Sequence, residues 1–135
     1  MKKHFILVVE YSNLAAMAIK EMLDRKGFRV NRASDGRAAL EKYQAQTSEY
    51  YDLILMNTWL PKISSRELTR IIRREEARPQ ADSRHSKCTP IIGIFSNKPH
   101  PKQCHYQKYY QAGMNDLFPF PLTERNLDKI MEKYL

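Results

Sequence analysis

Five residues that end or directly follow apolar segments carry the side chains from which a functional site could be built. They are Glu10, Tyr11, Asn57, Phe95 and Phe120. The carboxylate of Glu10 could bind a cation, but the Asn57 amide is a poor nucleophile and a weaker ligand for a hard cation than a carboxylate is. The Tyr11 phenol stays protonated at neutral pH, and the two phenylalanines have no polar group. One acid among neutral side chains disfavours an enzyme, so we expect Glu10 to bond to nearby backbone amides or to a neighbouring base.

A second group of potential ligands lies in the later part of the chain. It consists of His85, Cys88, His100, Cys104 and His105. Histidine and cysteine are zinc ligands, but this spacing matches none of the familiar zinc fingers. We therefore expect neither a metal site nor a cofactor.

The chain alternates short apolar segments with amphipathic ones. Strands are expected at residues 4–9, 29–33, 52–56, 90–95 and 116–118. Helices are expected at residues 13–26, 65–74 and 124–134, with one more through residues 39–43 and one that ends at Ala112. The first helix should face the core with the apolar stripe Leu14, Met17, Ala18 and Met22. Residues 75–89 are polar, basic and long for a connection, which indicates a mobile loop.

This alternation predicts an α/β domain with a parallel sheet. Parallel strands need crossover connections, and right-handed crossovers place helices on both faces of the sheet. Ligands of such sheets bind at the carboxyl ends of the strands, where the five residues considered first should meet. With 42% hydrophobic residues, the 135-residue chain can bury the core of a single domain.

The chain is strongly basic, with 23 Lys and Arg against 15 Asp and Glu and a net charge of +8. Such a field can attract nucleic acid, anionic lipid or an acidic protein. The basic residues are spread along the sequence, however, which favours a solvated surface. No apolar run is long enough to span a bilayer, and two cysteines make no disulfide framework, so we expect a cytoplasmic protein without membrane contact.

Six blocks occur in a recognisable order and spacing. They are ILVVE at residues 6–10, SDGRAALE at 34–41, YDLILM at 51–56, LP at 60–61, PII at 90–92 and AGMND at 112–116. In these blocks the chain resembles the receiver domain of two-component response regulators, especially the receivers of hybrid histidine kinases. The resemblance implies a flavodoxin-like, doubly wound fold with strand order 2-1-3-4-5. It also implies a cis peptide bond between Phe120 and Pro121.

The same resemblance shows where the chain departs from the family. A family receiver is phosphorylated on an aspartate and binds Mg²⁺ through that residue and an acidic pair, while a hydroxyl and a lysine bind the transferred group. In this sequence the acceptor position is Asn57, and the acidic pair is Glu10 and Tyr11. The hydroxyl position is Phe95, and the lysine position is Phe120. Only Glu10 is retained, and without the lysine or the metal nothing offsets charge developing on a transferring phosphoryl group. The resemblance therefore implies a pseudo-receiver.

Aromatic side chains take the place of the lost polar ones. We expect Tyr11, Phe95 and Phe120, with Trp59 close by, to converge on the former acidic pocket and to fill it. A filled pocket admits no ligand that could favour one of two states, so the domain should stay in one conformation.

The function expected from these features is a phosphorylation-independent module for protein interaction or regulation in two-component signalling. A histidine kinase or another two-component protein would be its partner. The contacts are expected at Tyr106, Tyr109, Tyr110 and Leu117, on the surface that receivers generally use. Two alternatives remain open: a basic module that binds nucleic acid or an acidic partner, and a sensor that holds a small apolar ligand in the altered pocket.

Overall fold

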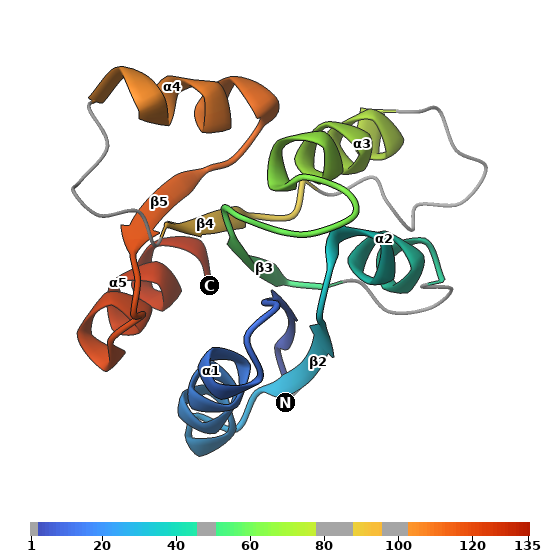
Figure 1. Ribbon diagram of the computed structural model, residues 1–135. Coiled ribbons are helices and arrows are strands. Elements are labelled where there is room, and N and C mark those ends of the chain that lie inside the picture. Colours follow the sequence, from blue (N-terminus) through green and yellow to red (C-terminus); the bar gives the residue numbers. More distant parts are fainter. Residues whose placement is uncertain (1–2, 46–50, 78–87, 96–102) are drawn as a thin grey trace.

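Five parallel strands form one sheet in the order β2-β1-β3-β4-β5, and five helices alternate with them along the chain (Figure 1). The structure is a computed structural model that describes residues 3–45, 51–77, 88–95 and 103–135. The strands are β1 (Phe5–Val9), β2 (Arg29–Ala33), β3 (Leu53–Asn57), β4 (Ile91–Phe95) and β5 (Asp116–Pro119). The helices are α1 (Asn13–Arg25), α2 (Gly36–Gln44), α3 (Ser65–Ala77), α4 (Gln103–Ala112) and α5 (Glu124–Tyr134). This arrangement confirms the predicted flavodoxin-like fold.

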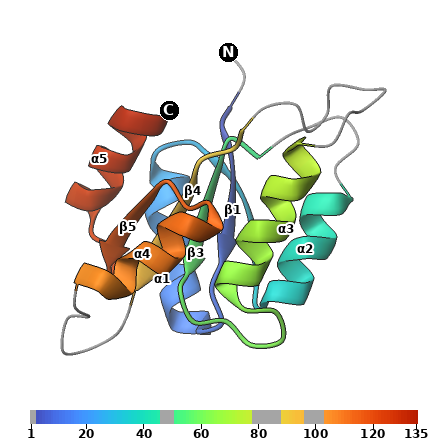
Figure 2. The same cartoon turned by 90° about the horizontal axis from the view of Figure 1, so that it is seen from above.

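The helices cover both faces of the sheet (Figure 2). Because successive side chains of a strand point to opposite faces, Leu7 and Val9 lie in one core and Ile6 and Val8 in the other. The first core packs against α2, α3 and the turn after α4, and the second packs against α1 and α5. Within the described residues, none of the helices is long and apolar enough to cross a membrane.

The side of α1 that faces the core differs from the prediction. Its buried residues are Ala16, Ile19, Met22 and Leu23. Of the predicted stripe only Met22 is buried, whereas Leu14 is 80% and Met17 66% exposed. The helix carries apolar residues on two sides, so helical spacing alone does not identify the core side. Packing of α1 against the sheet determines which of its two apolar sides is buried.

The connection between α3 and β4 also differs from the prediction of a mobile loop at residues 75–89. Helix α3 continues to Ala77, and Thr89 is buried with 3% exposure. The backbone N–H of Thr89 donates to Glu76 of α3 at 2.8 Å. The predicted loop boundaries are therefore wrong at both ends, whereas the mobility of the loop stays a prediction, because residues 78–87 lie outside the described part of the chain.

Three helices begin at polar residues that fix the loops at the carboxyl edge of the sheet. Ser12, Asp35 and Thr123 accept hydrogen bonds from the backbone of the first turns of α1, α2 and α5. Each of these bonds pairs a backbone N–H that the helix itself leaves unpaired. The turns that surround the candidate site are thereby held in place.

Candidate functional site

Glu10 and Asn57 meet at the carboxyl edge of the sheet, as the parallel pairing of β1 and β3 requires. Val9 lies opposite Met56 in the register, so the next residue of each strand reaches the same edge. The Asn57 side-chain amide donates a hydrogen bond to Glu10 Oε1 at 2.8 Å. Glu10 is 4% and Asn57 8% exposed. Glu10, the acid that follows β1, is thus bonded directly to the residue at the predicted acceptor position.

The remaining polar atoms of this pair are bonded to backbone. Glu10 Oε2 accepts from the Ser12 N–H at 2.8 Å, and Asn57 Oδ1 accepts from the Trp59 N–H at 2.9 Å. Glu10 is therefore a strand-end acid bonded to a backbone amide, as expected from the sequence, and also to a side-chain amide, which was not expected. Such a closed set of bonds satisfies a buried carboxylate without a cation.

Arg32 at the end of β2 holds the loop that follows β1. Its guanidinium donates from Nε and Nη2 to the Glu10 backbone carbonyl at 3.1 and 2.8 Å. Nη2 also donates to the Tyr11 carbonyl at 3.1 Å, and Nη1 donates to Asn13 Oδ1 at 2.9 Å. Sequence analysis missed this residue, because bonds to backbone carbonyls leave no pattern in side-chain types.

The four aromatic residues lie around this pair but do not merge into one plug. Tyr11 and Trp59 contact each other edge to face, with ring centroids 5.7 Å apart, and they are 57% and 59% exposed. Phe95 is 9% exposed and packs against Tyr106 of α4, with ring centroids 5.2 Å apart. The expectation that Tyr11 helps to fill the pocket is wrong, because its ring lies at the surface with its edge-to-face partner Trp59.

Phe120 lines a groove between α1 and the turn after β5. The groove has a volume of about 290 Å³ and is lined by Ser12, Leu14, Ala15, Ala18, Ile19, Phe120, Pro121 and Leu122. The Phe120–Pro121 peptide bond is cis, which confirms the prediction. This volume is at the lower end of the range for small-molecule sites, and its lining is almost entirely apolar.

An apolar surface adjoins the groove. We define the α1 apolar surface as Leu14 and Met17 of α1, with Tyr11, two residues before the helix, and Trp59, whose ring contacts that of Tyr11; each is more than half exposed. Leu14 and Met17 are three residues apart on α1 and are therefore neighbours on its outer side. Exposed apolar side chains that gather in one place commonly mark an interaction surface. Sequence analysis assigned Leu14 and Met17 to the core and so missed their role here.

The predicted contact surface at α4 and β5 is less exposed than expected. Tyr109 and Leu117 pack against the core, and Tyr106 packs against Phe95. Tyr110 is 45% exposed. Burial and the nearby Asp116 carboxylate raise the pKa of the Tyr110 phenol above its ordinary value. Of the predicted contact residues, Tyr110 is the most exposed.

Most of the histidines and cysteines considered as zinc ligands in the sequence analysis are not described by the structure. His85 and His100 lie outside the described residues, and no side-chain arrangement is described for Cys104 and His105. Cys88 is exposed. Among the side chains that are described, no three His, Cys, Asp or Glu residues form a metal-binding group.

Acidic residues interrupt the basic surface where the structure describes it. Arg25 pairs with Glu124, Lys26 with Asp128, Lys20 with Asp24 and Arg73 with Glu76. Glu67 lies 3.8 Å from Arg70 and 3.4 Å from Arg74. A basic surface divided in this way counts against the nucleic-acid alternative.

The fold and the edge of the sheet together define a receiver-type α/β domain, with its site at the ends of β1 and β3. The profile of the response regulator receiver domain matches residues 6–132, and the chain belongs to this family, which acts in two-component signal transduction.

Individual relatives agree with this assignment. The chain is 29% identical over 128 residues to hybrid signal transduction histidine kinase I of Dictyostelium discoideum, covering 93% of this chain and 7% of that protein. Sensor histidine kinase GacS of Pseudomonas protegens is 27% identical over 129 residues, or 13% of its length. The chain therefore spans only a small part of these relatives.

Solved structures have the same fold. The receiver domain of sensor histidine kinase PA1611 from Pseudomonas aeruginosa, solved with a magnesium ion in its active site cleft, superposes with a TM-score of 0.77 at 30% identity, covering 98% of both chains. The receiver of Ssk1 from Saccharomyces cerevisiae, solved with the histidine phosphotransfer protein Ypd1, has a TM-score of 0.79 at 20% identity, covering 98% of this chain and 88% of that one.

Proposed function

We propose that this chain is a phosphorylation-independent receiver that binds a protein partner and catalyses no reaction. The observation that carries this proposal is the hydrogen bond between the Asn57 amide and the Glu10 carboxylate. In this bond, the residue at the predicted phosphoryl-acceptor position and the predicted metal ligand contact each other directly. Among the described residues, the two positions therefore supply neither a carboxylate nucleophile nor a carboxylate free to bind a cation.

Magnesium binding at this site would be costly. Mg²⁺ prefers carboxylate oxygens in near-octahedral geometry and gives up its waters reluctantly. Glu10 would have to exchange two hydrogen bonds for a metal that no second carboxylate helps to hold, since Tyr11 points to the surface and contacts Trp59. Phe95 and Phe120 offer neither a hydroxyl nor a cation to a phosphoryl group. These features support the loss of both metal binding and phosphoryl transfer.

A protein partner of the two-component class fits the exposed features of the chain. The Ssk1 receiver, which shares this fold, was solved together with a histidine phosphotransfer protein. The α1 apolar surface borders a groove that could take an apolar side chain of a partner. We propose that a phosphotransfer or kinase protein contacts this surface and that docking takes place without transfer of a phosphoryl group.

The phosphorylation part of the proposal is tested with the chain's only tryptophan, Trp59, whose backbone N–H bonds to Asn57. Mg²⁺ is titrated into the millimolar range, followed by beryllofluoride, while the fluorescence of Trp59 is recorded. We expect no saturable change in the wild type. The matched control is Asn57→Asp, which supplies a second carboxylate and should respond to Mg²⁺. A saturable response of the wild type would overturn the proposal.

Acetyl phosphate provides a second readout for the same pair of proteins. We expect no acyl phosphate on the wild type and none on Asn57→Asp, because Phe95 and Phe120 remain in place. A stable acyl phosphate on the single variant would show that the chemistry needs only the aspartate.

The partner part is tested with a purified histidine phosphotransfer protein. We expect binding that is lost in a Leu14→Asp, Met17→Asp variant and retained in Lys20→Ala, a change on an exposed residue of the same helix. If the Leu14→Asp, Met17→Asp variant bound as tightly as the wild type, the proposed contact would be contradicted. If the wild type did not bind, this class of partner would be excluded. Binding to DNA that weakens steeply with salt would instead favour the nucleic-acid alternative.

A further inference from the structure

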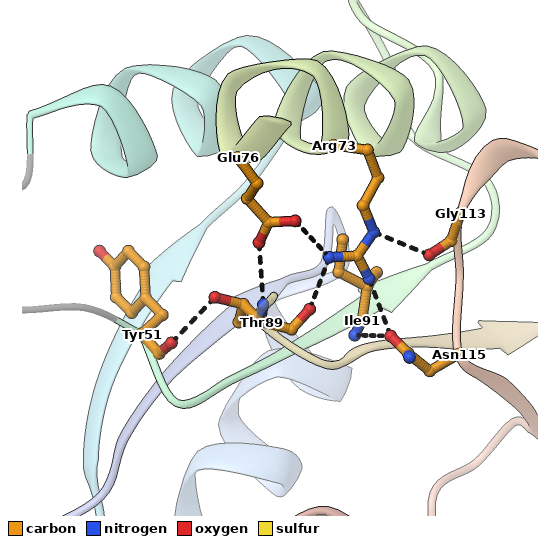
Figure 3. A network of polar contacts seen from close by, with 7 residues as sticks. All are labelled: Tyr51, Arg73, Glu76, Thr89, Ile91, Gly113 and Asn115. Carbon is orange, nitrogen blue, oxygen red and sulfur yellow. Dashed lines mark hydrogen bonds and ion pairs between the residues drawn. The ribbon is translucent and has the colours of Figure 1, made fainter. Parts of the chain in front are cut away.

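Arg73 of α3 joins three segments that are far apart in the sequence (Figure 3). Its guanidinium donates to the Gly113 carbonyl at 3.0 Å, to the Thr89 carbonyl at 2.9 Å and to Asn115 Oδ1 at 2.8 Å. It also pairs with Glu76 at 2.7 Å, one turn further along α3. Gly113 and Asn115 form the turn from α4 to β5, so a single side chain connects that turn to α3 and to the start of β4.

The partners of Arg73 are themselves fixed to β4. Glu76, whose side chain is 3% exposed, accepts from the Thr89 N–H at 2.8 Å through its other oxygen. Asn115 Oδ1 also accepts from the Ile91 N–H at 2.8 Å (Figure 3). The side chains of Glu76 and Asn115 therefore each accept hydrogen bonds from both the Arg73 guanidinium and a backbone amide at the start of β4. Planar, charge-assisted contacts of this kind hold both distance and direction.

Gly113 is required for this arrangement. Its φ of +120° is a conformation that residues with side chains rarely adopt, and an added Cβ would lie 2.7 Å from Arg73 Cγ. The turn after α4 and the stem of Arg73 are thus fitted to each other.

The other end of α4 is held by a different contact. Tyr106, in the first half of α4, packs its ring against Phe95 at the end of β4, with centroids 5.2 Å apart. Phe95 stands where the resemblance places a hydroxyl residue, so this contact exists because the chain departs from the family pattern at that position. A tilted aromatic pair at this distance is favourable in addition to the area that it buries.

We propose that these two contacts act as a clamp on α4, which holds the surface formed by α4 and β5 in one conformation without a phosphoryl group. We define the clamp as Arg73, Glu76 and Asn115 at one end and Phe95 with Tyr106 at the other. The inference rests on the proposed independence from phosphorylation and adds its regulation: the α4–β5 surface, which is separate from the α1 apolar surface, is permanently set and is preformed for any protein that contacts it. The exposed Tyr110 belongs to this surface.

Amide hydrogen exchange tests the clamp directly on the intact chain. We expect Arg73→Ala and Phe95→Thr each to raise the exchange of amides 106–118 by about tenfold or more, because each removes contacts that oppose local opening. The double variant should exceed either single one. The matched control is Arg70→Ala, also on α3, whose side chain is exposed and pairs only loosely with Glu67 at 3.8 Å. It should leave these amides unchanged.

Two further variants distinguish local opening of α4 from a loss of stability of the whole domain. Arg73→Lys keeps the charge but not the fork of donors, so it should give an intermediate increase. Glu76→Gln should accelerate the same amides while those of β1 and α1 stay protected. The clamp is refuted if exchange rises equally over the whole chain, if amides 106–118 do not respond, or if beryllofluoride changes their exchange in the wild type. A silent Mg²⁺ titration together with unresponsive amides would refute the clamp and leave the proposed function intact.

Discussion

Replacing Asn57 with aspartate puts two carboxylates where the structure has an acid and an amide. The amide nitrogen lies 2.8 Å from Glu10 Oε1. Two unit charges at that distance repel by about 6 kcal/mol at an effective dielectric constant of about 20. The pair can lower this cost by holding one proton, since raising a carboxyl pKa from about 4 to 7 costs roughly 4 kcal/mol. We therefore expect Asn57→Asp to lower the free energy of unfolding by about 2–4 kcal/mol at pH 7 without metal.

The sign of the pH dependence follows from the raised pKa of the new pair. A carboxyl whose pKa is higher in the folded state binds its proton more tightly there. Its contribution to stability is therefore fully present below about pH 4 and is lost as the pH rises through the higher pKa of the folded state. The difference between wild type and variant should therefore widen from about pH 4 to pH 7. Asn57→Ala is the control, because it also removes the donor to Glu10 but adds no charge and should show no such widening.

A second substitution tests the contact itself. In the double variant Glu10→Gln, Asn57→Asp, the glutamine can donate to the new aspartate while its oxygen accepts from the Ser12 N–H, so the bond is restored with its direction reversed. Urea unfolding followed by circular dichroism, in EDTA, measures the four proteins of this cycle. The reasoning would be refuted if Asn57→Asp were as stable as the wild type at pH 7. It would also be refuted if adding Glu10→Gln did not recover part of the unfolding free energy that Asn57→Asp loses.

Three other predictions concern stability and are measured by the same unfolding assay. Leu14→Ala should change the free energy of unfolding by less than about 0.5 kcal/mol, whereas Leu23→Ala should lower it by about 2–5 kcal/mol. Equal losses would show that Leu14 is buried in the core. Arg32→Ala should cost about 2 kcal/mol by releasing the loop after β1, and Arg32→Lys should recover less than half of that, a result contradicted by full recovery. Burial, followed by the hydrogen bond to Asp116, raises the pKa of Tyr134 to about 12. Because the folded state keeps this proton longer, stability should fall as the pH rises from about 10 towards 12, and Tyr134→Phe should flatten that fall; parallel curves would contradict it.

The sequence predicted the strands to within one residue at each end, and their order was predicted from the resemblance. Continuous apolar segments such as Ile6–Val9 are buried on both faces, and a strand of this kind can be recognised without knowing its neighbours. Helix α1 shows the limit of this approach. Its apolar residues lie on two sides, and only the position of the sheet selects Ile19 and Leu23 over Leu14 and Met17.

The candidate site was predictable in its residues but not in its contacts. Parallel pairing places Glu10 and Asn57 at one edge, which the sequence indicated, whereas the direct bond between them depends on side-chain rotamers. Arg32 and Arg73 each donate two or more hydrogen bonds to backbone carbonyls of distant segments. A carbonyl is present at every residue, so no pattern of residue types reveals such partners. The outward position of Tyr11 and Trp59 follows from their contact with each other, which sequence spacing does not encode.

The Glu10–Asn57 bond also sets how this site could be engineered into a phosphoryl acceptor. An aspartate introduced at position 57 alone would face Glu10 at close range, with Phe120 where the resemblance places a lysine, and the protein would lose stability before it gained any activity. Tyr11, Phe95 and Phe120 would each have to change as well before a phosphoryl group could be bound. A stepwise design that begins at position 57 would therefore pass through a destabilised protein, so the substitutions would have to be introduced together.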